Sequence, residues 1–332
     1  MMKVLTVSIA AYNVSGVIEK CLFSFSECKR LNEIEIIVVD DGSQDDTAAI
    51  VKEYARRYPG SIRLVSKRNG GHGSTINTSL VQATGKYFKV VDGDDWVSPV
   101  ALDHLVDFLL QVNADLILNN YNEVYLGKMV KVDVVGKHDL GIVYDFENAG
   151  LPKRIQMHSA TVRTELLKQL RWAISEHRFY VDTEYVFFIS MRAKSVVFNK
   201  EYVYQYRLGE MGQSVSPGGI FNHIEDLMFI EKRLIHIFYS KDVQDYMSRY
   251  RQIYLLGFLR ETYKVIISWY LLMKDNSKDM DLWNYHKEIV AVVPLFSDSL
   301  HLSLYQKMIL LWPKILMVFR WLKRIQLFFK KQ

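Results

Sequence analysis

The chain has 332 residues, of which 49% are apolar and 24% charged, and its formal net charge is +5. Its 6 prolines and 17 glycines exclude long disordered tracts, and the length predicts one large domain or two. The only cysteines, Cys21 and Cys28, argue against a disulfide or zinc framework and favour a reducing compartment, so we expect the cytosol.

Residues 3–95 predict alternating strands and helices. In the first segment, residues 3–13, apolar and polar residues alternate as in a strand. Its apolar run ends at the polar Tyr12 and Asn13, too early for a signal peptide. The order predicts an α/β fold with a doubly wound, Rossmann-like, mostly parallel sheet and helices on both faces. We expect strands at 3–13, 34–43, 62–67 and 86–95, and helices at 15–30, 44–59 and 74–85, with Ser15 as the first N-cap and Gly85 closing the third helix.

The pattern of apolar and polar residues changes after Pro99. A helix and a strand are expected up to residue 125, then a β-rich insertion over 126–150 and short mixed elements over 151–215. Pro217 followed by two glycines is a breaker cluster, and the remainder is predicted to be helical. We therefore divide the chain into 1–125, 126–216 and 217–332.

The polar residues that end the predicted strands should meet in one cleft, because ligands of parallel α/β sheets bind outside the carboxyl ends of the strands. Lys67, Arg68 and the glycine-rich "NGGHGS" before a helix favour a phosphate group. The carboxylates of Asp92, Asp94 and Asp95 repel such a group unless a divalent cation, Mg²⁺ or Mn²⁺, lies between them. The residues thus predict a metal-bound nucleoside diphosphate site.

Two common nucleotide motifs are absent from the sequence. There is no G-x-x-x-x-G-K-[ST] loop, and "AAYNVSG" stands where a dinucleotide fingerprint would follow the first strand. This disfavours P-loop NTPases and dehydrogenases.

Five motifs in order, "VSIAAYN", "IIVVDDGSQDDT", "NGGHGSTIN", "ATGKYFKVVDGDDWV" and "DTEY", resemble the inverting family 2 glycosyltransferases with the GT-A fold that build bacterial surface polysaccharides. The resemblance is dense over residues 3–120, looser over 151–216, and does not reach the last hundred residues. It implies a nucleotide-sugar-binding half at 1–125, an acceptor-binding half at 126–216, and a helical C-terminal region at 217–332.

The resemblance also implies roles for single residues. Asp40 or, preferably, Asp41 contacts the uracil, Asp92 lies near the ribose or sugar, and Asp94 ligates the metal. His72 stands in a stretch that lacks the arginine of many relatives, and Arg68 or Lys67 is expected to replace it. The donor-binding residues implied are Ala11, Tyr12, Asp40, Asp41, Arg68, Asn69, Gly70, His72, Asp92 and Arg207.

For the acceptor side, "VDTEY" resembles the family motif that carries the catalytic base. We predict Asp182 as the base, with Tyr180 and Glu184 as acceptor contacts; Val181 replaces a usual glutamate. The base must stand across the sugar from the metal, so that a hydroxyl of a glycan, glycolipid or glycoconjugate attacks opposite the leaving UDP. His158 and His177 are interpreted as structural histidines. The implied enzyme is a metal-dependent hexosyl- or N-acetylhexosaminyltransferase that uses a UDP-sugar.

Residues 301–332 combine aromatic residues with several Lys and Arg and contain no Asp or Glu. No charge-free run there approaches the roughly 20 residues that span a bilayer. We expect peripheral attachment to the inner, anionic face of the membrane, with a buried terminal helix as the alternative. No nucleic acid is expected as a partner, and the oligomeric state is left open.

Two other functions are considered. A nucleotidyltransferase can share the sheet and the acidic metal site, but that class shows a glycine-rich signature after its first strand, which "AAYNVSG" lacks. A non-catalytic, membrane-associated partner subunit of a transferase would need no turnover. Metal-dependent release of UDP from a UDP-sugar distinguishes a glycosyltransferase from both of these alternatives.

Overall fold

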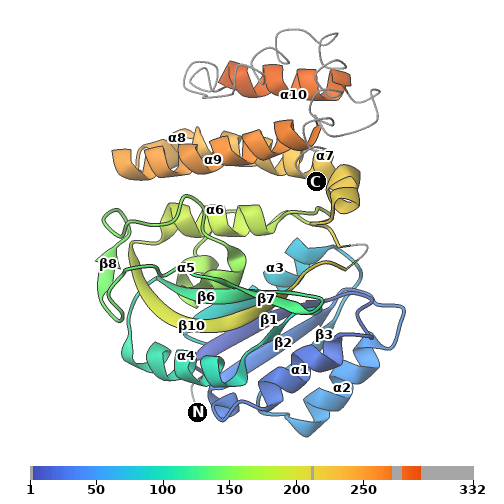
Figure 1. Cartoon of the computed structure of the whole chain (residues 1–332). Helices are drawn as coiled ribbons and strands as arrows, with labels where there is room; N and C mark the ends of the chain where they lie inside the picture. The colour runs from blue at the N-terminus through green and yellow to red at the C-terminus, as the bar shows by residue number, and fades with distance from the viewer. Residues whose placement is uncertain (1–2, 211–212, 271–278, 293–332) are drawn as a thin grey trace. The chain divides into compact units, whose positions relative to one another are not determined.

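The computed structural model describes residues 3–210, 213–270 and 279–292. The chain divides into two compact units, 1–210 and 211–332, which we describe separately. The first unit holds one sheet with helices on both faces (Figure 1). Strands from the predicted regions 1–125 and 126–216 share this sheet, so both regions contribute to one unit.

The sheet runs in the order β3, β2, β1, β4, β9, β6, β10, β5, and β7 pairs with β6 while β8 pairs with β10. The strands are β1 (Leu5–Ala11), β2 (Ile34–Asp40), β3 (Ile62–Ser66), β4 (Tyr87–Asp92), β5 (Trp96–Val97), β6 (Leu116–Tyr125), β7 (Lys128–Val132), β8 (Val143–Asp145), β9 (Ala160–Arg163) and β10 (Ser195–Arg207).

The first four strands form the parallel sheet that the sequence predicts. β1 pairs in parallel with β2 and β4, and β2 with β3. β2 is buried along its whole length, which explains its continuous apolar run. The register aligns Ala11 with Asp40 and Ala10 with Asp92, so the polar strand ends lie at one edge.

Beyond β4 the sheet also takes in antiparallel strands, whose pairing the sequence did not predict. β9 lies antiparallel between β4 and β6, and β10 runs parallel to β6. The short strands β5, β7 and β8 are all antiparallel to their partners. β6 passes into β7 through a tight turn, a connection that only antiparallel neighbours allow.

The helices cover both faces, as predicted. α1, α2 and α4 share one hydrophobic core with β1 and β2, and α3, α5 and α6 lie on the other face (Figure 1). The helices of this unit are α1 (Ile18–Ser26), α2 (Thr47–Arg57), α3 (His72–Gln82), α4 (Pro99–Gln111), α5 (Thr164–Lys168) and α6 (Asp182–Arg192), with short 3₁₀ turns η1 (Leu31–Glu33) and η2 (Met157–Ser159).

Two predicted helix ends are wrong. α1 begins at Ile18, because the backbone N–H of Ser15 is bonded to Asp45 Oδ2 at 3.0 Å and joins two loops rather than capping the helix. α3 ends at Gln82, before Gly85. Gly85 serves a close approach instead, since a Cβ there would lie 2.4 Å from the backbone nitrogen of Thr6.

The second unit is helical in its described part, as predicted. It contains α7 (Pro217–Phe238), α8 (Lys241–Gln244), α9 (Arg249–Tyr270) and α10 (Asp279–Val292). Ser216 caps α7 by accepting a bond from Gly219 N at 3.1 Å. Among described residues, no helix is long and apolar enough to cross a membrane. The tail 301–332, on which membrane attachment was predicted, lies outside the described residues.

Candidate active site

The ends of β1 and β2 are joined by hydrogen bonds into one rim. Asp41 N donates to Ala11 O at 2.8 Å, and Asn13 N donates to Ser43 Oγ at 3.0 Å. Asp40 Oδ1 accepts from Ser43 N at 3.1 Å and turns the chain toward α2. Ala11, Asp40 and Asp41 are buried, while the ring of Tyr12 is half exposed at the rim. The predicted base-binding residues are therefore neighbours.

Asp41 organises the glycine-rich loop that follows β3. Its Oδ1 accepts from Lys67 Nζ at 2.8 Å and its Oδ2 from Gly71 N at 2.7 Å, and Gly70 N lies 3.0 Å from Oδ1. Asp41 is only 2% exposed, so these partners enclose its carboxylate. Asp41 thus shapes the loop, and the sequence did not reveal this role.

Lys67 and Arg68 differ in what they offer a ligand. Lys67 Nζ is bonded to Asp41, to Arg68 O at 2.7 Å and to Ser74 Oγ at 2.8 Å. Arg68 and Asn69 are exposed. Of these two cations, Arg68 is the one available to a phosphate group.

Asp92, Asp94 and Asp95 form an acidic cluster at the carboxyl end of β4. Within this cluster, hydrogen bonds hold the side chain of Asp95. It accepts from Tyr204 Oη at 2.6 Å and from Arg207 N at 2.7 Å. Burial, and then the charges of Asp92 and Asp94, hold the pKa of Asp95 well above its usual value. Burial and the charge of Asp92 likewise raise the pKa of Asp94. Such carboxyl groups favour a bound cation, which would relieve their repulsion.

His158 completes a cation-binding group that the sequence analysis missed. Asp92, Asp95 and His158 each offer one ligand atom, and these atoms lie within 4.8 Å of one another. The imidazole stacks on Tyr206 with ring centroids 4.0 Å apart, and burial lowers its pKa to about 4. A neutral imidazole is the form that binds metals. The residues present therefore fit a divalent cation, with Asp94 beside this group rather than in it.

The place of His158 depends on a buried lysine in β4. Lys89 is fully buried, and its Nζ donates to His158 O at 2.9 Å and to Ala160 O at 3.2 Å. Burial lowers the pKa of Lys89 to about 7. These bonds fasten η2 and the start of β9 to the strand that carries Asp92.

His72 faces the same cluster from the first turn of α3. Its Nε2 lies 3.1 Å from Asp92 Oδ1, a contact without hydrogen-bond geometry, and this buried nitrogen has no hydrogen-bond partner. Burial lowers the pKa of His72, but the contact with Asp92 and the charges of Asp92, Asp182 and Asp94 together outweigh it, and the net shift is upward. His72 is thus a cation-forming group at the start of a helix, beside the acidic cluster.

A segment before α6, residues 174–177, lies directly on the glycine-rich loop. His177 N donates to Gly70 O at 2.6 Å, and Asn77 exchanges bonds of 2.9 and 3.0 Å with the backbone of Ile174. A Cβ on Gly73 would lie 1.9 Å from Ser175 O. This explains why residue 73 is a glycine, because any side chain there would push the segment of Ser175 away.

Asp182 and Glu184 open α6 but differ in surroundings. The charge of Asp182 acts on His72, His158 and Tyr206, so this predicted base lies on the side of the acidic cluster. Glu184 is fully buried, and it accepts from Ser175 N at 2.7 Å and from Ser175 Oγ at 2.8 Å. In this structure Glu184 holds the segment over Gly73.

Two other predicted residues have constrained places. Tyr180 adopts a left-handed backbone with φ of 61°, and its carbonyl accepts from Thr183 N at the start of α6. Arg207 bonds Asp95 through its backbone, and its guanidinium lies 5.8 Å from the ring of Trp96. Its charge lowers the pKa of Asp94, against the burial that raises it.

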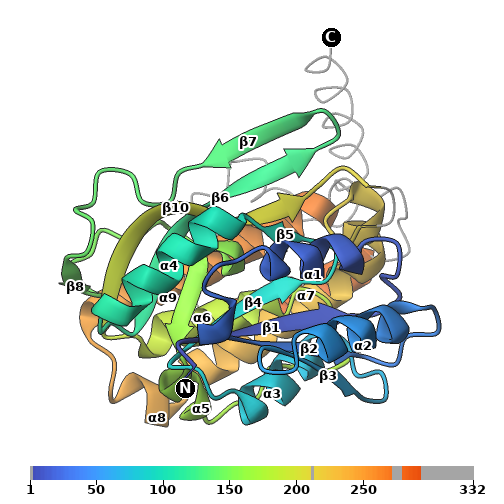
Figure 2. The ribbon, with the colours of Figure 1, turned by 90° about the horizontal axis from the view of Figure 1, so that it is seen from below.

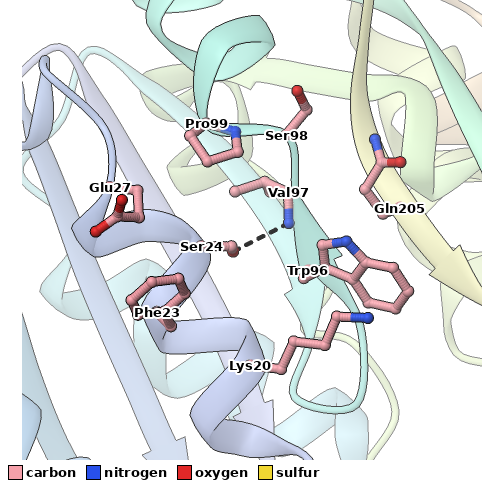
Figure 3. Close-up of a pocket in the computed structure, with 9 residues that line it drawn as sticks. All are labelled: Lys20, Phe23, Ser24, Glu27, Trp96, Val97, Ser98, Pro99 and Gln205. Carbon is pink, nitrogen blue, oxygen red and sulfur yellow. Dashed lines mark hydrogen bonds between the residues drawn. The ribbon is translucent and has the colours of Figure 1, made fainter.

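A hollow of about 370 Å³ lies between α1 and β5 (Figure 3). Trp96 pairs with Gln205 and Val97 with Tyr204, and paired residues share a face of the sheet. Trp96, Val97 and Gln205 all line the hollow. Lys20 Nζ covers the Trp96 ring at 3.0 Å. This hollow is separate from the cluster around Asp92.

Sequence comparison links the first part of the chain to one family. The model of glycosyl transferase family 2 matches residues 6–129. The minor teichoic acid biosynthesis protein GgaB of Bacillus subtilis (strain 168) is 27% identical over 296 residues, covering 85% of this chain and 31% of the relative. The uncharacterized glycosyltransferase EpsJ of the same organism is 36% identical over 117 residues, covering 35% of this chain and 33% of the relative. The chain spans about a third of the length of these curated relatives.

Solved structures share the fold. S. aureus TarS 1–349 in complex with UDP-GlcNAc matches with a TM-score of 0.72 and 20% identity, covering 96% of this chain and 88% of that chain. The mannosyltransferase PcManGT from Pyrobaculum calidifontis, in complex with GDP-Man and Mn²⁺, matches with a TM-score of 0.56 and 16% identity, covering 97% and 86%. These likenesses confirm the predicted fold class, a GT-A domain with a helical C-terminal region.

Proposed function

We propose that this chain, whose residues 6–129 match the model of glycosyl transferase family 2, transfers a sugar from a nucleoside diphosphate donor to a hydroxyl group. One observation carries the proposal: Asp92, Asp95 and His158 lie within 4.8 Å at the carboxyl edge of the sheet. His72, at the end of the glycine-rich loop, contacts the same Asp92. A cation and a diphosphate can share this edge, as the ligand position in α/β sheets requires.

A UDP-sugar is the donor that we propose. The exposed Tyr12 ring offers a stacking surface for the base beside Ala11. Because Asp41 is enclosed by the glycine-rich loop, we assign the uracil contact to Asp40 and a loop-shaping role to Asp41. The likeness to TarS, whose structure holds UDP-GlcNAc, supports a hexosyl or N-acetylhexosaminyl group.

The diphosphate is proposed to lie between Arg68, Asn69 and Gly70 on one side and the acidic cluster on the other. Asp92, Asp95 and His158 would hold the cation, with Asp94 completing its surroundings. Carboxylates suit Mn²⁺ and Mg²⁺, while imidazole suits transition metals, so Mn²⁺ fits this set better. When bound, the cation supplies Lewis-acid neutralisation of the departing diphosphate. His72 and Arg207 add positive charge nearby.

Asp182 is proposed as the base that takes the proton of the acceptor hydroxyl. Its charge acts on His72, His158 and Tyr206, which supports a carboxylate beside the proposed donor site but outside the cation-binding group. A base across the sugar from the diphosphate gives inversion at the anomeric carbon. Tyr180, immediately before α6, is the proposed acceptor contact, and Glu184 acts through Ser175.

The acceptor is proposed to be a hydroxyl of a bacterial surface glycan, glycolipid or glycoconjugate, reached at the inner face of the membrane. The match to GgaB, a minor teichoic acid biosynthesis protein, over 85% of this chain supports a cell-envelope polymer. Peripheral attachment through residues 301–332 belongs to this proposal.

A donor screen tests the function. The full chain is incubated with UDP-, GDP- and dTDP-sugars, with Mn²⁺, Mg²⁺ or EDTA, and nucleotide release is measured. We expect release of UDP from at least one UDP-sugar with metal only, its loss in Asp92→Asn, and its retention in Asp139→Asn, a matched change in the loop before β8. Pyrophosphate release from a nucleoside triphosphate and a sugar phosphate would instead support a nucleotidyltransferase. Absence of any turnover would favour the non-catalytic subunit.

A further inference from the structure

The hairpin of β6 and β7 extends past the rest of the sheet (Figure 2). Tyr125 pairs with Lys128 across a turn formed by Leu126 and Gly127, and Gly127 has φ of +74°. The turn needs glycine at one of these positions for this backbone. It does not need leucine at the other, where polar residues are usual.

The tip of this hairpin exposes apolar side chains. Leu126 is 103% exposed, Met129 57% and Tyr125 38%. Isolated exposed apolar residues are ordinary, but here Tyr125, Leu126 and Met129 lie within five consecutive positions of the hairpin. Leu126 and Met129 gain nothing from packing within the first unit at this exposure.

The charges of the hairpin tip are all positive. Residues 124–132 contain Lys128 and Lys131 and no Asp or Glu. Glu123, the nearest acidic residue before them, accepts a bond from Tyr125 Oη at 3.0 Å. Lys131 Nζ lies 5.2 Å from the Tyr202 ring, and Lys128 is exposed. Apolar groups with flanking lysines complement a surface that is apolar within and anionic at its boundary.

The tip adjoins the candidate active site along two strands. Val124 pairs with Arg207 of β10, and Leu208 N donates to Val124 O at 2.8 Å. Arg207 N binds Asp95 of the acidic cluster at 2.7 Å. The turn thus starts two residues beyond Val124, the strand position that pairs with Arg207.

We propose that the hairpin tip, residues 124–131, inserts into the interface of a bilayer with anionic headgroups. Leu126 and Met129 enter the boundary of the acyl chains, and Lys128 and Lys131 contact lipid phosphates. This surface is independent of the tail 301–332. If the proposed transferase function holds, the insertion also turns the carboxyl edge of the sheet toward a lipid-linked acceptor; the insertion itself does not depend on that function.

A local probe tests the insertion in the full chain without donor or acceptor. Cys21 and Cys28 are buried, so Leu126→Cys can be labelled selectively with an environment-sensitive dye. The matched control is Val81→Cys, on an 81% exposed position of α3. With vesicles of phosphatidylcholine and phosphatidylglycerol we expect a blue shift and a rise in emission at position 126 and no change at position 81.

Three outcomes would overturn the proposal: no change at position 126, an equal change at both positions, or a change that appears with rising protein concentration without vesicles, which would indicate a second copy as the partner. A second variant keeps the test independent of labelling. Leu126→Ser with Met129→Ser should reduce partition into the anionic vesicles by roughly tenfold or more, as expected for losing two buried apolar side chains. Unchanged partition of this variant would leave the tail as the membrane contact and contradict the hairpin's role.

Discussion

Replacing Lys89 with methionine should change how the stability of the first unit depends on pH. Lys89 lies fully buried in β4, and its ammonium donates to His158 O and Ala160 O. Among described residues, no salt bridge pairs it with a carboxylate. Burying an ammonium group without a counter-ion disfavours its charged form. The folded protein therefore carries this cation at a free-energy cost below its pKa.

The size of this effect on stability follows from the shift in the pKa of Lys89. Burial lowers the pKa of Lys89 from 10.5 to about 7. Below pH 7 the lysine is charged in the folded and unfolded chain, and the cost is fully present. Between pH 7 and 10.5 the folded chain binds fewer protons than the unfolded chain, so stability rises with pH. The wild type should gain about 2 kcal/mol relative to Lys89→Met between pH 7 and pH 9, because the slope is half of its full value of about 1.4 kcal/mol for each pH unit at pH 7 and approaches that value only above pH 8.

The assay is urea unfolding of both proteins at pH 6.5, 7.5, 8.5 and 9, followed by circular dichroism. The difference between the unfolding free energies of the two proteins is taken at each pH. The contribution of the tyrosines with raised pKa values cancels in this difference, because both proteins contain them. The variant also leaves two carbonyl oxygens without a donor, a loss of about 1–3 kcal/mol each that does not vary with pH. Only the slope of the difference therefore reports on Lys89.

A difference that stays flat from pH 6.5 to 9 would refute the reasoning, because it would mean that Lys89 is not buried as a cation. A falling difference would do the same, since a lowered pKa in the folded chain can only raise the difference with pH in this range. Lys89→Arg serves as the matched control. Its guanidinium stays charged throughout this range, so it should show no such rise.

Three further predictions concern the segment over the glycine-rich loop and the base. Gly73→Ala should destabilise the first unit by about 2 kcal/mol or more, because its Cβ would overlap Ser175 O; a Tm equal to that of Ala83→Gly or of the wild type would contradict the close approach. Glu184→Gln should keep one bond to Ser175 and raise the KM for the acceptor more than it lowers kcat, whereas an equal fall in kcat would point to direct catalysis. Asp182→Asn should lower kcat by roughly 10²–10⁴ with little change in donor binding, and near-normal turnover would exclude it as the base.

The sequence predicted the features that depend on local pattern. Continuous apolar runs gave the parallel strands, and their shared direction brought Ala11, Asp40 and Asp92 to one edge. The roles of Asp41 and Glu184 were not predictable in this way. Both carboxylates are enclosed by backbone N–H groups and side chains of loops whose paths only the folded chain defines.

His158 illustrates the same limit more strongly. It is remote in sequence from Asp92, and it reaches the cluster because β9 inserts antiparallel between β4 and β6 and Lys89 holds the preceding turn. A parallel-sheet prediction has no place for such a strand. The lysine inside the apolar run "YFKVV" was the one signal in the sequence, since a cation in a buried strand requires nearby acceptors.

Asp92, Asp95 and His158 are proposed to form a metal-dependent site for the diphosphate of the donor. Calorimetric titration of UDP into the full chain, with Mn²⁺ and with EDTA, measures it most directly. We predict that Mn²⁺ tightens UDP binding by roughly tenfold or more, as expected for a cation that bridges carboxylates and phosphates, and that His158→Ala removes this gain while binding in EDTA persists. Equal affinity with Mn²⁺ and EDTA in the wild type would contradict the account.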